Sequence, residues 1–427
     1  MSHSGWARAG RPAALRVKLT MLGAAIEVAM TVLMSACNGC NNTPVVQQVW
    51  VADTQNNRVL DFSALNPING VATDANQVVG QPNYTSNSPN AGAAISAQGL
   101  SSPRAVAFDN AGNMWVADTN NNRVLGFAKN PNSVFGGVNS SASTVIGQPN
   151  FTSGQVNFGE SSPNRQGFNQ PLALAFDPGG NLWVADNGNC RILEFQAPFP
   201  ANGAGAVTVI GPIGQSSFET TCTYAGTGPL GLAFDAGGDL FASYQDATDS
   251  GGAVVIEFKA PLKSGMPPTA NVTSNVCTAG PGGNRDLCGP GALAVDKSGN
   301  LWVTDVNGDR VLEFPPPYTS GASLVLGQPN FTSGQVNWCP SPCTPAFNSP
   351  TATGFGSPRG VAVDGVGNVF VSDSGNNRVV EFSPPLSNGK AATLVLGQST
   401  LTANGAGSSQ NAINTPTGVT APGSPLF

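Results

Sequence analysis

Histidine is almost absent from this chain of 427 residues, because the sequence contains a single one, His3. His3 lies in an N-terminal segment with the pattern of an export signal, so we expect the mature chain to contain none. Without imidazole a protein cannot form a Ser-His-Asp triad, a histidine zinc site or a histidine general base. The sequence therefore excludes histidine-dependent catalysis in the mature chain.

Clusters of basic residues and long helical patterns are absent as well. The chain has 18 basic and 24 acidic residues, of which four basic and one acidic lie in residues 1–36, so removal of that segment leaves a formal charge of −9. Nucleic-acid phosphates are bound by clustered Lys and Arg, and hence we expect no nucleic-acid partner. The 53 glycines and 34 prolines fit a β fold with many turns.

One phrase recurs six times along the chain. Such repetition through so long a sequence indicates a repeat architecture. The copies are VWVADTQNNRVL from Val49, MWVADTNNNRVLGF from Met114, LWVADNGNCRILEF from Leu182, a divergent copy from Leu240, LWVTDVNGDRVLEF from Leu301 and VFVSDSGNNRVVEF from Val369.

Each repeat is expected to form four antiparallel strands. In the second repeat an apolar run covers residues 103–109, and an Asn-Ala-Gly-Asn turn follows. In residues 114–127 apolar and polar side chains alternate on both sides of a short polar segment, which predicts two strands and a second tight turn. A fourth strand is expected over residues 143–148. Four such strands form one blade of a β-propeller.

The two ends of the repeat region complete each other. The region begins with a second half at residue 49 and ends with a first half at residues 414–420. Joining them gives six blades, the first of which is completed by both ends, and closure of the ring hides sheet edges. We predict an all-β, six-bladed propeller over residues 49–427.

The pattern Gly-Asn-hydrophobic-aromatic-Val-Ala-Asp-x-x-Asn-Asn-Arg-Val resembles the NHL repeat family of β-propellers over residues 45–420. The resemblance implies an exported bacterial NHL-repeat protein. Related propeller enzymes, among them the peptide-amidating lyase, the streptogramin lyases and the quinoprotein glucose dehydrogenases, use histidine, so none of their site residues carries over. The motif positions lie 58 to 68 residues apart, beyond the roughly 40–50 of comparable repeats, and the excess must lie in loops.

A second repeated phrase marks these loops. Residues 147–158 return almost unchanged as residues 327–338, and looser copies begin at Gly80, Gly214 and Gly397. The loops connect the outermost strand of one blade to the innermost strand of the next, on the same face as the Asp-x-x-Asn-Asn-Arg turns. Either Phe151 and Phe331 pack over the blade edges and the loops are structural, or the loops form a collar around a binding surface.

Acidic and basic residues of the main phrase recur in register, whereas a catalytic residue should occur once. We therefore expect the turn pairs to brace the hairpins through charge-assisted hydrogen bonds, with a ring of ligand-binding arginines as the alternative. The pairs are Asp53 and Arg58, Asp118 and Arg123, Asp186 and Arg191, Asp305 and Arg310, and Asp373 and Arg378. The recurring Glu194, Glu257, Glu313 and Glu381 are expected to be solvated strand-end carboxylates.

The fourth repeat departs from the others, and a unique ligand site is expected where the repeat symmetry breaks. Tyr244 replaces the motif Asp, Val254 replaces the motif Arg, and the turn between them is longer. The alternative explanation is that loss of the ion pair removed a constraint on this turn, whose sequence then changed without a functional reason. The candidate ligand-binding residues are Tyr244, Asp246, Asp249, Arg285 and Asp286.

Metal and cofactor sites are not predicted. Asp246 and Asp249 supply oxygen ligands of the type that calcium prefers, but two acids are not a full set. A carboxylate-metal hydrolase or lactonase at the central channel remains an alternative function, because gluconolactonase-type propellers bind one metal through carboxylates and an Asn. We name no catalytic residue and favour a binding protein over an enzyme.

The N-terminus and the cysteines indicate export. Residues 1–36 contain basic, then apolar, then small residues and form the expected export signal; Leu33-Met34-Ser35-Ala36-Cys37 resembles a bacterial lipobox, with Cys37 as the lipidated residue and residues 37–48 as a linker. Ordinary cleavage and an uncleaved anchor are alternatives.

The expected disulfides, which suit an oxidising compartment, are Cys190–Cys222, Cys277–Cys288 and Cys339–Cys343; metal or redox chemistry is the alternative for the last pair.

Together these features predict an extracytoplasmic protein of the bacterial cell envelope, either lipid-anchored or secreted. Its expected role is binding or scaffolding, with a protein, peptide or glycan as ligand at the loop-rich face. We expect a monomer that contacts the membrane only through its N-terminal anchor.

Overall fold

Short β-strands rich in valine, leucine and alanine form the core of the chain, because apolar and β-branched side chains fit a pleated, buried surface. The computed structural model describes residues 48–63, 74–129, 140–210, 218, 228–244, 254–273, 283–340 and 349–421. The chain divides into two compact units, Met1–Val45 and Val46–Phe427, and all of the described residues belong to the second.

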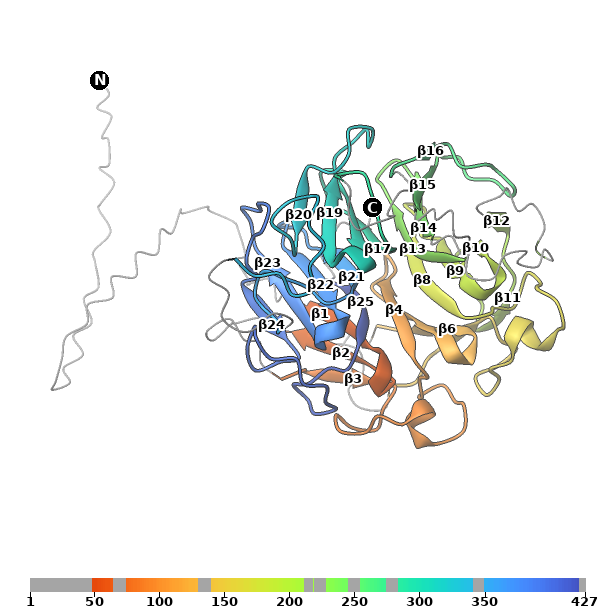
Figure 1. The fold of residues 1–427 in the computed structure, drawn as a ribbon. Helices are drawn as coiled ribbons and strands as arrows, with labels where there is room; N and C mark the ends of the chain where they lie inside the picture. Colours follow the sequence, from red (N-terminus) through yellow and green to blue (C-terminus); the bar gives the residue numbers. More distant parts are fainter. Residues whose placement is uncertain are drawn as a thin grey trace, which may run out of the picture. The chain divides into compact units, whose positions relative to one another are not determined.

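The described strands form six sheets, or blades, each built on four antiparallel strands ordered from the centre of the ring outwards, and the sheet of blade 2 has a fifth strand in addition (Figure 1). Blade 1 contains β25 (Pro416–Thr420), β1 (Gln48–Asp53), β2 (Arg58–Ser63) and β3 (Gln77–Val79). Blade 2 contains β4 (Pro103–Phe108), β5 (Met114–Asp118), β6 (Arg123–Phe127) and β7 (Thr144–Ile146). Blade 3 contains β8 (Pro171–Phe176), β9 (Leu182–Asp186), β10 (Arg191–Phe195) and β12 (Thr208–Ile210).

The remaining blades follow the same plan. Blade 4 contains β13 (Pro229–Phe234), β14 (Leu240–Tyr244), β15 (Val254–Phe258) and β16 (Ala270–Asn271). Blade 5 contains β17 (Pro290–Val295), β18 (Leu301–Asp305), β19 (Arg310–Phe314) and β20 (Leu324–Leu326). Blade 6 contains β21 (Pro358–Val363), β22 (Val369–Asp373), β23 (Arg378–Phe382) and β24 (Leu394–Leu396).

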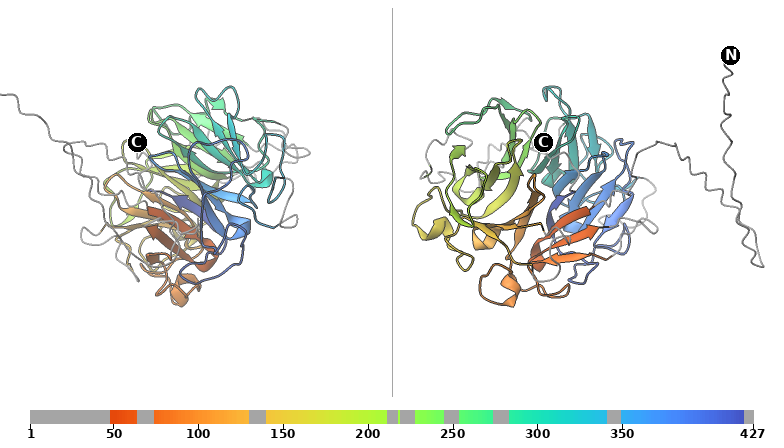
Figure 2. Two further views of the ribbon diagram at one scale, coloured as in Figure 1. Left: turned by 90° about the vertical axis from the view of Figure 1, so that its left-hand side faces the viewer. Right: turned by 180° about the vertical axis from the view of Figure 1, so that it is seen from behind.

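The innermost strands form a closed ring (Figure 2). Each of β4, β8, β13, β17 and β21 contacts the next, and β25 contacts both β21 and β4. In blade 1, β25 pairs with β1, with Trp50 opposite Thr420 and Val51 opposite Val419. The predictions of six four-stranded blades and of a first blade completed by both ends of the repeat region are confirmed.

Two kinds of turn repeat around the ring. The predicted turn after the innermost strand is held by an Asp: the Asp109 carboxylate accepts hydrogen bonds from the N–H groups of Ala111 and Asn113 at 3.0 and 2.8 Å, and from the Trp115 indole at 3.1 Å. The turn between the second and third strands is a single 3-10 turn. These turns are η1 (Thr54–Asn56), η3 (Thr119–Asn121), η5 (Asn187–Asn189), η6 (Val306–Gly308) and η7 (Ser374–Asn376).

The sheet of blade 2 has one strand more than the sequence predicts. Strand β11 (Asn202–Ala204), which follows β10 in blade 3, pairs in parallel with the outer strand β7. The Val145 N–H donates to the Ala201 carbonyl at 2.9 Å. The extra strand partly covers an outer edge that would otherwise present unpaired backbone groups to solvent.

The core lies between the blades. One buried cluster combines Trp50 and Val59 of blade 1 with Val106, Val116 and Leu125 of blade 2, and similar clusters occupy the spaces between the other blades. Within the described ranges, which contain no α-helix, no helix is long and apolar enough to cross a membrane.

Candidate functional site

A buried ion pair lies under the 3-10 turn of five blades. The arginine Nε donates to the Oδ2 of the Asp at the end of the preceding strand, and both side chains are at most 1% exposed. The distances are 2.6 Å for Asp53–Arg58, 2.7 Å for Asp118–Arg123, Asp186–Arg191 and Asp373–Arg378, and 2.8 Å for Asp305–Arg310.

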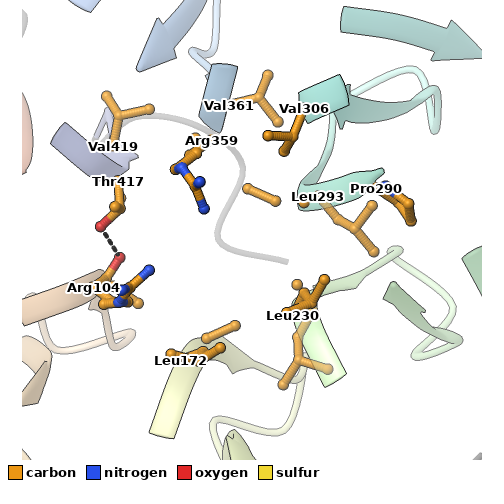
Figure 3. A pocket seen from close by; sticks show the side chains of 18 of the residues that line it. Arg104, Leu172, Leu230, Pro290, Leu293, Val306, Arg359, Val361, Thr417 and Val419 are labelled. Carbon is orange, nitrogen blue, oxygen red and sulfur yellow. Dashed lines mark hydrogen bonds between the residues drawn. The ribbon is translucent and has the colours of Figure 1, made fainter. Parts of the chain in front are cut away.

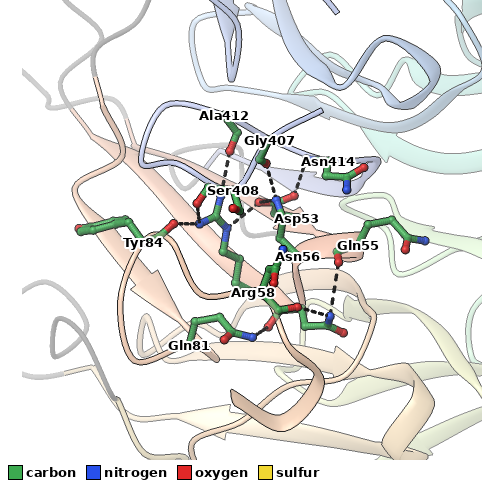
Figure 4. Close-up of polar contacts among 12 residues, drawn as sticks. Asp53, Gln55, Asn56, Arg58, Gln81, Tyr84, Gly407, Ser408, Ala412 and Asn414 are labelled. Atoms are coloured by element: carbon green, nitrogen blue, oxygen red, sulfur yellow. Dashed lines mark hydrogen bonds and ion pairs between the residues drawn. The ribbon is translucent and has the colours of Figure 1, made fainter. Parts of the chain in front are cut away.

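Each arginine also holds the long loops. Arg123 donates to the carbonyl of Phe151, in the loop that leaves its own blade, at 2.6 Å. It donates to the carbonyls of Ser96 and Gly99, in the loop that enters the blade, at 2.8 and 3.0 Å. Figure 4 shows the same arrangement in blade 1, where the guanidinium of Arg58 donates to the carbonyl of Tyr84, in the loop that leaves the blade, and to those of Ser409 and Ala412, in the loop that leads into β25. The pair therefore joins a hairpin and two loops.

The glutamine and asparagine of the loop phrase have matching partners. The Gln148 amide donates to the carbonyls of Asn122 and Gln155 at 2.9 and 2.7 Å. The Oδ1 of Asn157 accepts a hydrogen bond from Asn189 at 2.9 Å. Phe151 packs, partly buried, against the core cluster between blades 1 and 2, and Phe331 packs against the cluster between blades 4 and 5. These contacts support the structural explanation of the repeated loop phrase.

The first residue of the 3-10 turn connects neighbouring blades. The hydroxyls of Thr54 and Thr119 each donate to the carbonyl of the first proline of the next innermost strand at 2.7 Å. Asn187 donates to the corresponding carbonyl at 3.2 Å, and Ser374 does so in blade 6. In blade 5 this position is Val306, which has no side-chain donor and instead lines the central channel.

The central channel opens on the face of these turns and loops into a cavity of about 250 Å³. The cavity is lined mainly by the innermost strands, whose second residues differ from blade to blade. From blade 1 to blade 6 they are Thr417, Arg104, Leu172, Leu230, Gly291 and Arg359. Figure 3 shows Arg359, Thr417 and Arg104 on one side of the opening, with Leu172, Leu230 and Leu293 on the other.

The charge in this cavity is positive. The described lining residues include two arginines and no Asp or Glu. Burial lowers the pKa of the Arg104 guanidinium, and the nearby charge of Arg359 lowers it further. The carboxylate-metal alternative needs acids at this place, and the described lining offers arginines instead.

Arg104 and Arg359 are not among the site residues predicted from the sequence. The sequence does contain a signal for them. The first residue of the innermost strand is Pro in every blade, whereas the second residue is Thr, Arg, Leu or Gly, depending on the blade. The recurring residues of the repeat are structural, whereas a site that occurs once lies where the residues of the repeat differ.

The residues singled out in blade 4 do not gather at one place within the described chain. Tyr244 is 4% exposed and packs in the core between blades 3 and 4, and its hydroxyl has no hydrogen-bond partner among the described residues. Arg285 donates to the carbonyls of Thr319 and Val272. The Asp286 carbonyl accepts from Arg310.

Several other predicted features lie outside the described residues. They are Asp246 and Asp249, the export signal over residues 1–36, Cys37 with the linker up to residue 47, and Cys222, Cys277 and Cys343. Their expected partners Cys190, Cys288 and Cys339 are described, and the three disulfide pairings stay predictions. Among the described residues, no group of three or more His, Cys, Asp or Glu side chains could hold a metal ion.

Three of the four recurring strand-end glutamates are buried, contrary to the sequence-based expectation, and Glu313 is half-buried. Glu194 and Glu381 are each 8% exposed and Glu257 is 6% exposed. Burial raises the pKa of Glu194, Glu313 and Glu381. The reason is that the loop and the fourth strand of each blade cover the end of the third strand, which strand periodicity alone does not reveal.

A model of the NHL repeat family matches residues 100–127, 168–195 and 355–382. Among curated proteins, peptidyl-glycine alpha-amidating monooxygenase of Mus musculus is 38% identical over 100 residues, and that of Rattus norvegicus is 37% identical over 100 residues. The matched region covers 22% of this chain and 8% of either relative.

Two solved structures are similar in fold. A chain of a nidogen/laminin complex has a TM-score of 0.50 at 13% identity, with 88% of this chain and 98% of that chain covered. A Bacteroides caccae protein of unknown function has a TM-score of 0.46 at 10% identity, with the same shares covered. At such identities the likeness concerns the fold alone.

The Arg123→Ala substitution is expected to lower the free energy of unfolding by about 3–5 kcal/mol, because it leaves the Asp118 carboxylate buried without its partner. Amide hydrogen exchange in residues 147–158 should also accelerate, since the loop loses its anchor. Urea unfolding and hydrogen-exchange mass spectrometry measure both effects. The exposed Lys129→Ala serves as the control and should change stability by less than about 0.5 kcal/mol. A loss below about 1 kcal/mol for Arg123→Ala would contradict the bracing role.

Asp309 predicts a pH dependence of stability. It occupies the left-handed turn position that Asn122 holds in blade 2. Burial, together with the charges of Asp373 and Asp305, raises the pKa of Asp309 to about 6, although the Ser357 N–H donates to its carboxylate at 2.7 Å. The folded state therefore binds more protons than the unfolded state, whose carboxyl has a pKa near 4, and stability falls as pH rises from about 4 to 6.

The Asp309→Asn variant should remove this loss. Its amide oxygen can still accept from Ser357, so we expect the free energy of unfolding to rise by about 1–2 kcal/mol at pH 7, with allowance for nearby solvent, and to be unchanged near pH 4. Urea titrations at both pH values measure the difference. The reciprocal Asn122→Asp variant should be destabilised at pH 7. Equal stability of Asp309→Asn and the unaltered protein at pH 7 would contradict the raised pKa.

Proposed function

Because this chain is an NHL-repeat β-propeller, we propose that it is an extracytoplasmic binding or scaffold protein of the bacterial cell envelope. Its ligand would be a protein, peptide or glycan that docks on the face formed by the long loops and the 3-10 turns, which we call the loop face. The observation that carries this proposal is the network of buried arginines, which fixes those loops in place.

Fixed loops favour binding because less conformational freedom is lost when a partner docks. Loops of this length are normally mobile and variable. Here Arg, Gln and Asn side chains of the repeat hold them at both ends, so the loop face presents a surface of defined shape. A chain similar in fold comes from a nidogen/laminin complex, which supports a protein as partner.

Two exposed valines identify a part of the loop face that could contact a partner. Val156 and Val336 are 43% and 48% exposed and hold matching positions in the two nearly identical loops. They belong to blades 2 and 5, which lie opposite each other in a ring of six. Val366 is 73% exposed but lies in the turn between β21 and β22, on the opposite face.

Export and anchoring complete the proposal. The basic and apolar residues 1–36 would direct the chain out of the cytoplasm, and lipidation of Cys37 would attach it to the membrane. Disulfides at Cys190, Cys288 and Cys339 would suit that oxidising compartment. The protein would act as a monomer.

The test is a comparison of the two faces. The immobilised protein is incubated with an envelope extract of the source organism, and retained molecules are identified by mass spectrometry. We expect Val156→Asp and Val336→Asp each to reduce retention of the partner by about tenfold or more, since a charge would be buried at the contact. Loss of binding through either valine supports the loop face as the docking surface.

The Val366→Asp variant is the matched control, because it adds the same charge at a more exposed valine on the other face. It should retain the partner at the level of the unaltered protein. Equal retention by all three variants, or a loss caused by Val366→Asp alone, would contradict docking on the loop face.

A further inference from the structure

The cavity at the mouth of the channel is divided into a charged half and an apolar half. Arg359, Thr417 and Arg104 come from blades 6, 1 and 2, which are consecutive in the ring. Blades 3 and 4 contribute Leu172 and Leu230 at the corresponding positions. The inner strands have the same backbone register, so the division arises from side chains alone.

The two arginines have no counter-charge. Neither Arg104 nor Arg359 forms an ion pair or a side-chain hydrogen bond within the described part of the chain. Thr417 between them is already engaged, since its hydroxyl donates to the Arg104 carbonyl at 3.0 Å (Figure 3). The contrast with the five turn arginines is clear, because each of those has a carboxylate at 2.6–2.8 Å.

Two like charges in one cavity are unfavourable for folding. Burial lowers the pKa of the Arg104 guanidinium, and the charge of Arg359 lowers it further, as expected for two guanidinium groups that line one cavity. The guanidinium remains protonated because its pKa begins far above neutrality. An oxyanion between the two groups would remove the repulsion and accept up to two forked hydrogen bonds.

The wall opposite the two arginines determines which kind of group, polar or apolar, can be attached to the anion. Leu172, Leu230 and Leu293 offer apolar surface, and Val306 extends it at a position where the other four described turns have a polar residue. Gly291 adds no side chain at the corresponding position of blade 5, where a Cβ would meet Thr304 Oγ1 at 2.6 Å. The volume of about 250 Å³ is below the roughly 300–1,000 Å³ of pockets for drug-sized ligands. It suits a small molecule with one charged and one apolar end.

We propose that the channel mouth binds a small organic oxyanion, with its charged group between Arg104 and Arg359 and its apolar group against Leu172, Leu230 and Leu293. This site goes beyond the proposed docking of a macromolecule and does not depend on it. Carboxylates and phosphates share the necessary charge and acceptor geometry, and the probes below distinguish a free inorganic anion from one that carries an apolar group.

The test is isothermal titration calorimetry of hexanoate with the purified full chain at low ionic strength. We expect saturable 1:1 binding that weakens with added salt, because the contact is partly exposed. Arg104→Gln and Arg359→Gln should each weaken binding about ten- to a hundredfold. Acetate and inorganic phosphate should bind more weakly than hexanoate, and hexanol should not bind measurably.

Thermal unfolding separates loss of the site from loss of the fold. In the absence of ligand, both variants should have a Tm equal to or above that of the unaltered protein, since each removes a like-charge repulsion. Lys263→Gln, an equal change of charge at an exposed side chain away from the channel, should alter neither Tm nor hexanoate binding.

Three results would overturn the proposal. They are no saturable hexanoate binding by the unaltered protein, hexanoate binding that survives both arginine substitutions, and equal affinity for acetate and hexanoate. The last would show that the leucine wall contributes nothing. None of these results bears on docking at the loop face, which is tested through Val156 and Val336.

Discussion

The buried Asp–Arg pair is the interaction on which the rest of this structure depends. A propeller blade made only of short strands has few internal contacts to define how its loops run. Placing one carboxylate and one guanidinium beneath the 3-10 turn joins the hairpin to the loops that enter and leave the blade. The carboxylate also accepts the backbone N–H of a residue just before the innermost strand, as Asp118 does from Ser101 at 2.6 Å. Each pair thereby fixes the hairpin and the two loops of its own blade, so that in five blades buried charges hold the exposed loops in place.

Much of this arrangement follows from the repeat. The blade number, the closure of blade 1 by β25 and the positions of both turns are all predictable, because each depends on a local pattern that occurs several times in the sequence. Partners distant in sequence were not predictable in the same way. The hydrogen bond between Asn189 and Asn157 depends on how the loops fold back over the blades. So does the covering of Glu194 by a neighbouring loop. The sequence pattern of the strands contains no information on either. The strand β11 shows the same limit, since an edge can be covered by any extended segment that passes near it.

The candidate site illustrates a different limit. The positions of the phrase that recur, chiefly the Asp and Arg of the turn, are structural. Their side chains are buried and paired, and they are present in five of the six blades. The channel is built from the same inner strands, yet its chemistry comes from the second residue, where Arg104 and Arg359 replace the leucines of blades 3 and 4. Blade 4 departs from the repeat more obviously, because it lacks the Asp and Arg of the turn, yet its most prominent replacement, Tyr244, lies in the core. The amount of sequence change is therefore a poor guide to function, and the direction in which the changed side chain points is a better one.

Closure of blade 1 has a consequence for the order of assembly. Strand β1 is the first described strand, yet its inner neighbour β25 (Pro416–Thr420) is the last described strand. Until residue 420 is available, the first blade has an open inner edge and the cluster that combines Val51 with Val419 cannot form. The ring can therefore close only after the ribosome has synthesised the chain as far as residue 420, and until then blade 1 lacks its inner strand.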